Sequence, residues 1–324
     1  MARGIRFHAV GGPEVLRLEE FPDPEPGPGE ALVRQYACGL NMVDVYQRNG
    51  VYRVPLPSGA GSEGAGVVER VGPGVTSVRP GDRVAYAGGP LGAYADLRTV
   101  PADRLCLLPA EVTFEQAAGM MLKGLTVQYL IRRTYPVKPG DAVLFHAAAG
   151  GVGLIACQWL NALGARVIGT AGSDEKCALA LRHGAAHCIN YRTQRFVEVA
   201  RELTGGAGVA VVYDSVGRDT FLDSLDCLRP MGLMVSFGNA SGPAPAIEPA
   251  LLAHKGSLFL TRPLLATYTA RRADLEAMAR DLFEIVVSGK VRIAVERKYP
   301  LDQAAQAHRD LEARRTTGSS VLIP

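Results

Sequence analysis

The stretch from residue 141 to residue 176 constrains the fold more than any other, because it carries a strand, a glycine-rich turn, a helix and a second strand in succession. Residues 141–146 (DAVLFH) form a short apolar run, typical of a buried parallel strand. Residues 147–153 (AAAGGVG) form the turn, and residues 154–163 continue as an apolar helix. Residues 166–170 (RVIGT) supply the next strand. This order predicts a βαβ dinucleotide-binding unit.

The glycines of the turn fit a site for a pyrophosphate. Gly150 and Gly153, with Gly151 and Val152 between them, let the backbone approach the phosphates and let the helix pack against the sheet. The helix start also presents free N–H groups and a positive dipole end. Ala148 stands where the common GxGxxG pattern has its first glycine. An ordinary glycine-rich turn is the alternative, and the flanking strand and helix favour the nucleotide site.

The end of the second strand indicates which coenzyme is bound. NAD-specific units carry Asp or Glu about 20 residues after the turn, to hold the adenosine ribose. Here Ala171 stands at that place, followed by Ser173 and Lys176. A carboxylate ~4 Å from a 2′-phosphate would cost several kcal/mol, even at an effective dielectric constant of ~20. The sequence therefore favours NADPH.

Neighbouring residues give a mixed signal about the same pocket. Tyr191-Arg192 ends the next predicted strand and adds a phenol and a guanidinium to it. Asp174 and Glu175 count against a phosphate, unless they face solvent in the first turn of the helix. Ser173 also fits a plain helix N-cap.

Strands alternate with helices through the middle of the chain. Six strands with helices between them predict a complete doubly wound parallel α/β sheet. They are expected at residues 141–146, 166–170, 186–190, 209–213, 232–237 and 257–261. A long helix over 113–134 precedes them, and Gly124 is expected to break it in two.

The two ends of the chain have a different character. Residues 1 to about 100 look β-rich, with strands expected at 30–37, 59–71 and 84–95 and a short helix at 40–50. The last part reads as a helix, a strand, a helix and a strand, at residues 270–288, 291–295, 301–314 and 319–323. A tail of this kind most simply rejoins the first domain. The domain limits expected are 1–122, 123–265 and 266–324.

Composition excludes several classes of protein. At 324 residues the chain is long enough for two domains, and a net charge of +3 is too small to indicate a nucleic-acid surface. None of the six cysteines forms a CxxC motif. The start of the chain lacks an apolar signal core, and no run of 18 apolar residues occurs without Gly or charge. We expect a cytoplasmic protein.

Several motifs in order resemble the medium-chain dehydrogenases/reductases, and within them the quinone oxidoreductase (zeta-crystallin-like) family. They cover essentially the whole chain: HAVGGPEVL, GLNMVDVYQRNGVY, GSEGAGVVERVGPGV, LGAYADLRTV, LKGLTVQYLIRRT, HAAAGGVGLIACQ, VYDSVGRDT and GSSVLIP. The resemblance implies a six-stranded Rossmann domain for NADPH and a β-rich, GroES-like catalytic domain built from both chain ends.

The family is defined partly by the absence of zinc. In zinc alcohol dehydrogenases of the same superfamily, a cysteine and a histidine bind the metal at the places that Asn41 and Ser62 occupy here. Amide and hydroxyl are poor zinc ligands, and a catalytic zinc needs about three protein ligands. His183, His187 and Cys188 have ligand-like spacing, but an ordinary loop is the better interpretation. No metal is therefore expected.

A reduction without zinc needs an acceptor that requires no Lewis acid, such as a quinone or an activated enone. The resemblance places Asn41, Asp44, Tyr46 and Tyr52 over the nicotinamide. Tyr46 and Tyr52 are expected to stack on a planar quinone and donate a phenolic hydrogen bond, since a phenol with a pKa near 10 is a donor at neutral pH. Asn41 is expected to act as an amide donor. The alternative is that the tyrosines merely line a wall of the site.

The resemblance also assigns the coenzyme contacts. Thr126 and Tyr129 are expected at the nicotinamide ribose, Gly150 to Gly153 at the pyrophosphate, and Ser173, Lys176 and Tyr191 at the 2′-phosphate. The remaining candidates follow strands or lie in the tail: Ser215, Phe237, Gly238, Phe259 and Thr261, with Arg314 and Gly318 closing the site. For strand-end Ser and Gly, simple turn chemistry is nearly as good an explanation.

Residues 256–262 (GSLFLTR) are expected to form the outermost strand, whose apolar edge needs cover. The resemblance implies a homodimer through this strand, whereas burial under the tail remains open. Two other functions are considered besides quinone reduction. One is NADPH-dependent reduction of α,β-unsaturated ketones or aldehydes. The other is a non-catalytic NADPH- and RNA-binding protein, for which no basic-aromatic run is present.

Overall fold

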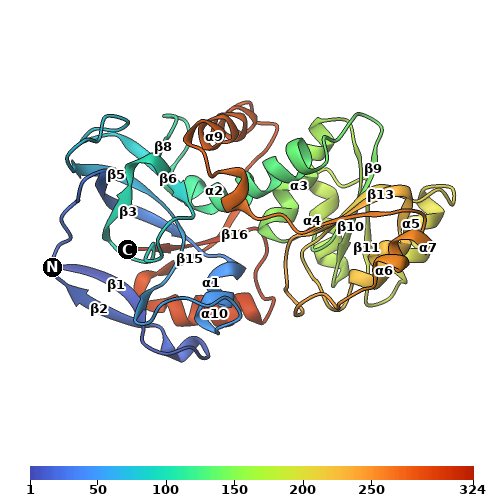
Figure 1. Ribbon diagram of the computed structural model, residues 1–324, viewed down its shortest axis with the longest axis horizontal. Coiled ribbons are helices and arrows are strands. Elements are labelled where there is room, and N and C mark those ends of the chain that lie inside the picture. Colours follow the sequence, from blue (N-terminus) through green and yellow to red (C-terminus); the bar gives the residue numbers. More distant parts are fainter. The chain divides into compact units, whose positions relative to one another are not determined.

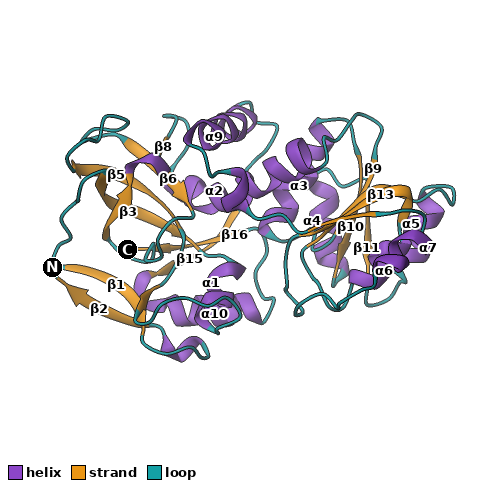
Figure 2. Ribbon diagram, viewed as in Figure 1, coloured by secondary structure: helices purple, strands orange, loops and turns teal.

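The computed structural model describes residues 1–324, which form two compact units. Unit 1 comprises Met1–Leu125, Thr269–Val287 and Ile293–Pro324, and unit 2 comprises Thr126–Tyr268 and Ser288–Arg292. Unit 1 is rich in strands, whereas unit 2 combines a sheet with many helices (Figures 1 and 2). None of the helices combines the length and the hydropathy that a bilayer crossing requires.

Unit 2 is built on one parallel sheet, as the sequence predicted. Its six strands run in the order β11-β10-β9-β12-β13-β14, and every neighbouring pair is parallel. The strands are β9 (Ala142–Phe145), β10 (Arg166–Ala171), β11 (His187–Asn190), β12 (Val209–Asp214), β13 (Leu228–Ser236) and β14 (Phe259–Thr261). All residues of β12 are buried, as expected for a central strand that is covered on both faces.

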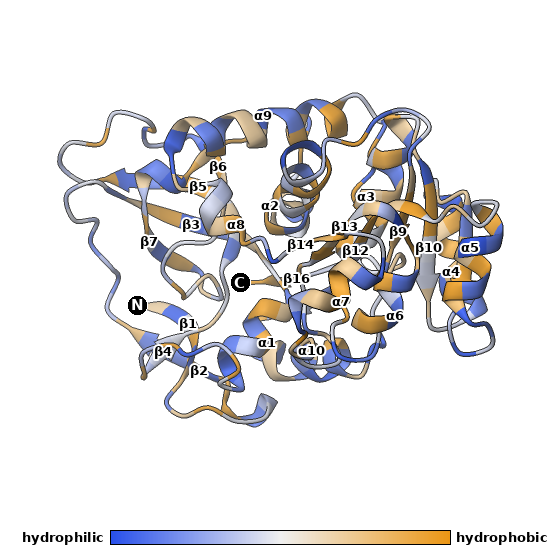
Figure 3. Cartoon of the chain, turned by 45° about the vertical axis from the view of Figure 1, so that its right-hand side comes forward, coloured by the Kyte–Doolittle hydropathy of each residue, from blue (hydrophilic) through white to orange (hydrophobic).

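Helices and turns connect these strands. The helices of unit 2 after α2 are α3 (Gly151–Ala162), α4 (Asp174–Arg182), α5 (Phe196–Leu203), α6 (Phe221–Asp226), α7 (Pro249–His254) and α8 (Leu265–Tyr268). Hydrophobic and hydrophilic residues alternate along α5 (Figure 3), which is the pattern of a helix that buries one side.

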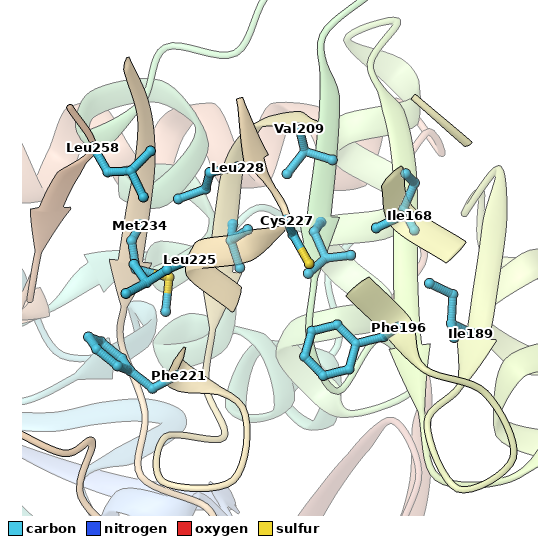
Figure 4. Packing of buried hydrophobic residues seen from close by; sticks show 13 residues of the cluster. Ile168, Ile189, Phe196, Val209, Phe221, Leu225, Cys227, Leu228, Met234 and Leu258 are labelled. Atoms are coloured by element: carbon cyan, nitrogen blue, oxygen red, sulfur yellow. The ribbon is translucent and has the colours of Figure 1, made fainter. Parts of the chain in front are cut away.

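One face of the sheet packs on α5, α6 and α7. Phe196 of α5 and Phe221 and Leu225 of α6 meet side chains from neighbouring strands, among them Ile168 and Met234 (Figure 4). Each buried side chain of this size contributes about 1.5–3 kcal/mol. Side chains alternate along a strand, so the neighbours of these strand residues face the helices on the other side.

Unit 1 holds a seven-stranded sheet to which both ends of the chain contribute. Its order is β15-β16-β3-β5-β6-β8, with β7 also paired to β3. The strands are β3 (Glu30–Gly39), β5 (Glu63–Val71), β6 (Arg83–Ala87), β7 (Leu97–Pro101), β8 (Cys106–Leu107), β15 (Val295–Pro300) and β16 (Ser319–Ile323). Strand β16 lies antiparallel to β3, with Val321 opposite Gly39 (Figure 1). The expected return of the tail to the first domain is therefore confirmed.

A smaller sheet and four longer helices complete unit 1. The sheet has the order β2-β1-β4, formed by β1 (Ala2–Phe7), β2 (Arg17–Phe21) and β4 (Ser58–Gly59). The helices are α1 (Met42–Arg48), α2 (Phe114–Tyr129), α9 (Arg272–Val287) and α10 (Ala304–Glu312); the last residues of α2 belong to unit 2. Short 3₁₀ helices cover Pro13–Val15, Ala102–Arg104 and Leu301–Gln303.

The prediction that Gly124 breaks the helix over 113–134 is wrong. Helix α2 runs without interruption to Tyr129, and a π-helical turn, Leu130–Thr134, follows it. A Cβ at Gly124 would lie 2.5 Å from Leu282 Cδ1 of α9. The glycine is therefore needed for close packing of two helices and not for a break.

Four other elements have limits that differ from the expectation. The strand expected at 291–295 begins only at Val295. The backbone N–H of Arg292 donates a hydrogen bond to Gln158 Oε1 at 2.9 Å, so it is not available for pairing with a strand. Strand β6 ends at Ala87, since Gly88 and the next glycine have positive φ. Strand β5 begins at residue 63, four residues after the predicted start. The helix predicted over 301–314 starts as a 3₁₀ turn and ends at Glu312.

Candidate functional site

The glycine-rich turn of unit 2 brings backbone N–H groups to the carboxyl end of β9. Helix α3 begins at Gly151, three residues before the predicted start, with Gly150 as its N-cap. A Cβ at Gly153 would lie 2.4 Å from the carbonyl oxygen of Ala147, so only glycine lets the helix approach the turn this closely. The N–H groups of the first helical turn have no acceptor within the helix. Gly150 to Gly153, including Val152, therefore form a cradle that suits a pyrophosphate.

A buried histidine directly before this turn is hydrogen-bonded through both of its ring nitrogens. His146, the residue before the turn, places Nδ1 at 2.9 Å from Thr170 Oγ1 and Nε2 at 2.9 Å from Ser224 Oγ. Burial lowers the pKa of His146, so the ring is neutral. Asp214 of β12 accepts from Ser224 Oγ at 3.2 Å, which links the ends of two neighbouring strands. Sequence reasoning assigned no role to this network.

The end of β10 carries the groups that were expected at a 2′-phosphate. Ser173 is the N-cap of α4, and its Oγ accepts from the Lys176 N–H at 3.3 Å. A Cβ at Gly172 would lie 2.6 Å from Tyr191 Oη, so the phenol lies directly against this turn. Ser173, Lys176 and Tyr191 thus come together, and the strand itself ends at Ala171 without a carboxylate.

The two carboxylates that counted against a phosphate are exposed, and both are hydrogen-bonded. Asp174 and Glu175 are both exposed, and Asp174 Oδ1 accepts from Asn190 Nδ2 at 2.8 Å. A hydrogen bond from Ser173 lowers the pKa of Glu175. The Ser173 hydroxyl therefore has a partner in Glu175 as well as its capping role.

The ends of β12 and β13 meet at the same edge of the sheet. A Cβ at Gly238 would lie 2.3 Å from the Ser215 carbonyl oxygen, and the Phe237 N–H donates to the Asp214 carbonyl at 2.7 Å. Ser215, Phe237 and Gly238 are thus brought together as predicted. Arg262, which sequence reasoning missed, donates from Nη1 to the Gly238 carbonyl at 3.0 Å. Its position directly after the last predicted strand was the available signal.

The other predicted coenzyme residues are distributed more widely. Thr261 ends β14 opposite Val235, whereas Phe259 starts that strand, so Phe259 is not brought to the carboxyl edge. Thr126 and Tyr129 are buried in α2, and the Tyr129 ring stacks on Tyr268 at 4.5 Å. The remaining two candidates, Arg314 and Gly318, lie between α10 and β16 of unit 1 and both have positive φ.

The predicted catalytic residues cluster around α1 of unit 1. Asn41 is the N-cap of this helix, and its backbone N–H donates to Asp44 Oδ2 at 2.9 Å. Tyr52 donates its backbone N–H to the Tyr46 carbonyl at 2.8 Å. The two tyrosine rings lie 5.4 Å apart at an interplanar angle of 70°. One short helix and its following turn therefore bring Asn41, Asp44, Tyr46 and Tyr52 together.

Asp44 is a buried carboxyl with several donors. Ser62 Oγ donates to its Oδ1 at 3.0 Å, and Tyr94 Oη donates to its Oδ2 at 2.8 Å. Burial raises the pKa of Asp44 to about 6, although the hydrogen bonds from Tyr94 and Ser62 lower it. The group is therefore able to change its protonation state near neutral pH.

A column of hydrogen-bonded side chains runs from Asp44 through Tyr94 and His308 to Arg48. His308 of α10 places Nε2 at 3.3 Å from Tyr94 Oη and Nδ1 at 3.3 Å from Arg48 Nη1. Burial lowers the pKa of His308 to about 3, so the ring is neutral. Because Arg48 can only donate, Nδ1 accepts and Nε2 carries the hydrogen that points to Tyr94. Arg48 also donates two hydrogen bonds to Glu312, which fixes the outer end of the column.

A second buried carboxyl lies on the other side of Asn41. Glu63 is 0% exposed and accepts from Asn41 Nδ2 at 2.7 Å and from the Leu122 N–H at 2.7 Å. Lys123 Nζ lies 3.5 Å from Glu63 Oε2. Burial raises the pKa of Glu63, and the Lys123 ammonium opposes this rise. Sequence reasoning missed both residues, although Lys123 is a single charge within the apolar run 117–127.

At the two positions that correspond to zinc ligands in zinc alcohol dehydrogenases, the side chains donate hydrogen bonds to carboxyl groups. The amide of Asn41 donates to Glu63, and the hydroxyl of Ser62 donates to Asp44. The structure holds no group of three or more His, Cys, Asp or Glu side chains that is arranged to bind a metal ion. All six cysteines are free thiols.

Comparisons with known proteins agree on one family. Residues 27–110 match the alcohol dehydrogenase GroES-like domain, and residues 151–282 match the zinc-binding dehydrogenase domain. The chain is 54% identical to a quinone oxidoreductase of Pseudomonas aeruginosa, over the full length of both proteins. It is 46% identical to a 2-haloacrylate reductase of a Burkholderia species, over 100% of this chain and 99% of that protein. The structure of an Escherichia coli quinone oxidoreductase complexed with NADPH superposes with a TM-score of 0.98, at 52% identity and full coverage of both chains.

We predict that Tyr94→Phe raises the pKa of Asp44 above about 6, because it removes a hydrogen bond that favours the carboxylate. The folded-state pKa lies above the ordinary value of 3.8, so the folded protein binds this proton more tightly than the unfolded chain. Stability therefore falls as pH rises from about 4 to about 6, and the variant extends this fall to higher pH. Carbon-13 NMR of the carboxyl groups and unfolding curves at several pH values measure both effects.

The matched control is Tyr299→Phe, which removes a similar hydrogen bond to Asp310 in the same unit. Both variants are expected to lose about 1–2 kcal/mol of stability. Only the first should change the titration of Asp44. An unchanged Asp44 titration in the Tyr94 variant would contradict the prediction.

Proposed function

The chain belongs to the quinone oxidoreductase family of the medium-chain dehydrogenases/reductases, and on this premise we propose that it reduces quinones by hydride transfer from NADPH, without a metal ion. The domain limits expected from the sequence give each domain one role. The coenzyme is bound within residues 123–265, and the acceptor is held by residues of unit 1.

The observation that carries the choice of coenzyme is the chemistry at the end of β10. The hydroxyl of Ser173 and the phenol of Tyr191 lie where an NAD-specific site needs a carboxylate, and Lys176 follows in the first turn of α4. Lys176 supplies the charge that a 2′-phosphate needs, and Asp174 and Glu175 are exposed. The cradle of Gly150 to Gly153 holds the pyrophosphate, and Ser215, Phe237, Gly238 and Thr261 contribute to the nicotinamide end.

The acceptor is held by the side chains around α1. Tyr46 and Tyr52 offer two rings and two phenolic donors, and the Asn41 amide offers a further N–H. Asp44 anchors the start of the helix through the Asn41 backbone. A quinone suits this set because its reduced form delocalises negative charge over the ring, so hydrogen-bond donors suffice without a Lewis acid.

A second candidate reaction is the NADPH-dependent reduction of α,β-unsaturated ketones or aldehydes. The 46% identity to a 2-haloacrylate reductase favours it, because that protein's substrate is an activated alkene. Both reactions deliver a hydride to an electron-poor conjugated system, so the same residues serve either one.

We further propose a homodimer and a cytoplasmic location. Strand β14 is an outer strand of its sheet, and it exposes 61% of Phe259 and 39% of Leu260. An open edge with apolar side chains favours pairing with the same edge of a second copy. Six free cysteines are typical of a reducing compartment.

The proposed function is tested by following the oxidation of NADPH and NADH with benzoquinones, naphthoquinones, phenanthrenequinone and 2-alkenals. We expect NADPH with quinones to give the highest kcat/KM. Lys176→Met should raise the KM for NADPH about 10- to 100-fold, because a charge-assisted hydrogen bond contributes about 1.5–3 kcal/mol. The KM for NADH should hardly change. The control is Lys290→Met, at an exposed lysine of unit 2. Equal use of both coenzymes by the unmodified protein would refute the role of Lys176.

The roles of the two tyrosines are tested with Tyr46→Phe and Tyr52→Phe. Each variant loses a phenolic donor but keeps the ring, so we expect kcat with quinones to fall about tenfold while the affinity for NADPH is retained. Tyr36→Phe, at an exposed tyrosine of β3, is the control. Unchanged turnover in both variants would mean that the tyrosines only line the site.

The dimer is tested by analytical ultracentrifugation of Phe259→Asp/Leu260→Lys. We expect the unmodified protein to sediment as a dimer and the double variant as a monomer, because charges on the edge strand oppose pairing. Leu222→Lys, at an exposed leucine of α6, controls for the loss of an apolar surface residue. A dimer that persists in the double variant would exclude this edge as the interface.

A further inference from the structure

Helix α2 buries an ammonium group that the proposed mechanism has not used. Lys123 is only 6% exposed, although its helix turn is otherwise apolar. A buried charge is retained only where a partner and hydrogen bonds offset the loss of hydration. We infer that Lys123 donates a hydrogen bond to the carbonyl oxygen of the acceptor and stabilises the negative charge that hydride transfer leaves there. This inference rests on the proposed function.

The hydrogen bonds of Lys123 leave one donor for a substrate. The ammonium carries three N–H groups. The structure gives them two acceptors, the Leu40 carbonyl at 3.1 Å and Glu63 Oε2 at 3.5 Å. A third N–H held in a buried site without an acceptor is costly, and an oxygen of a bound acceptor would satisfy it.

Two neighbours place this donor beside the predicted acceptor site. Leu40 directly precedes Asn41, and the Asn41 amide donates to the same oxygen of Glu63 that binds Lys123, at 2.7 Å. Glu63 thus fixes one amide N–H and one ammonium N–H at a single carboxylate oxygen. The second N–H of the Asn41 amide and the third of Lys123 therefore belong to one cluster of donors at the start of α1.

The charge balance of the cluster suits a reaction that creates an anion. Before reaction, Lys123 and Glu63 form a neutral pair, with the carboxylate anchored by the Leu122 N–H. Hydride transfer brings two electrons and one hydrogen nucleus to the quinone and oxidises NADPH to NADP⁺. The product is a hydroquinone anion, and a proton from water completes the hydroquinone. An ammonium near the oxygen that gains charge binds this anion more strongly than the neutral quinone, which lowers the barrier.

A lysine suits this task better than an arginine would. Its charge is compact and lies at the end of a flexible chain, so it can follow an oxygen whose charge changes during the reaction. A planar guanidinium would engage the Glu63 carboxylate with two parallel hydrogen bonds, which directs its donors to the carboxylate. The long and single-oxygen contact of Lys123 with Glu63, at 3.5 Å, leaves the ammonium available.

The test compares Lys123→Met/Glu63→Gln with the unmodified protein. Replacing both partners avoids an unpaired buried carboxylate, so the variant is expected to fold and to bind NADPH with a Kd within about twofold of the original. Its kcat with quinones should fall by a factor on the order of 10²–10³, the usual effect of removing one donor to a developing oxyanion. Lys255→Met, which breaks a lysine–aspartate pair in unit 2, is the matched control and should keep full activity.

Chemical rescue distinguishes the effect of the charge of Lys123 from the effect of its size. Lys123→Ala keeps Glu63, and its kcat should rise about tenfold when propylammonium is added to the solution. No such rise is expected with 1-propanol, which has a similar size and no charge. Equal rescue by both compounds, or a kcat of the double variant within about threefold of the original, would overturn the inference. If the unmodified protein fails to reduce quinones, the proposed function itself falls, which is a separate result from a fully active double variant.

Discussion

Two buried carboxyl groups, Asp44 and Glu63, impose the main constraint on unit 1. Each requires partners because an isolated buried charge costs several kcal/mol. Asp44 is surrounded by the Ser62 and Tyr94 hydroxyls and the Asn41 backbone, and Glu63 by two N–H groups and an ammonium. The partners come from the N-cap of α1, from α2, from the residue before β5 and from the loop before β7. Satisfying two carboxyl groups therefore fixes how distant parts of the chain meet around α1.

The same constraint explains how this chain differs from zinc-dependent members of its superfamily. A zinc site needs thiolate or imidazole ligands that bring negative charge or lone pairs to a cation. At the corresponding places, Asn41 and Ser62 act as donors, and each is directed to a carboxylate. Positive charge enters this region through the ammonium of Lys123 instead. The polarity of the site is thus set by side chains that donate hydrogen bonds.

The sequence was sufficient to predict the parts of the structure that depend on local signals. The turn over 147–153, the six parallel strands and the short helix at Asn41 all follow from residues that are near one another in the chain. The N-cap role of Ser173 was likewise visible. The column from Asp44 through Tyr94 to His308 was not, because its members are separated by 50 and 214 residues and none carries a local pattern.

At Gly124, by contrast, a local signal led to a wrong prediction. A glycine within a helical pattern lowers helix propensity, which justified the predicted break. Its actual role depends on Leu282, a residue more than 150 positions later that packs where a side chain would be. The register of Phe259, which the resemblance assigns to the coenzyme, is likewise visible only in the sheet: it lies opposite Leu233, at the start of its strand. Contacts of this kind appear only when the sheet order and the helix packing are known.

The pairing of β16 with β3 has a consequence for the order in which the protein is completed during synthesis. The sheet of unit 2 receives its last strand at Thr261, whereas Gly39 of β3 pairs with Val321, which is made 282 residues later (321 − 39). A ribosome adds about 5–20 residues per second, and domains fold as units when their residues have emerged. Unit 2 thus has all its strands while the main sheet of unit 1 still lacks β15 and β16. The synthesis of β16, and not the emergence of the first hundred residues, completes the sheet of the unit that holds Asn41 and Lys123.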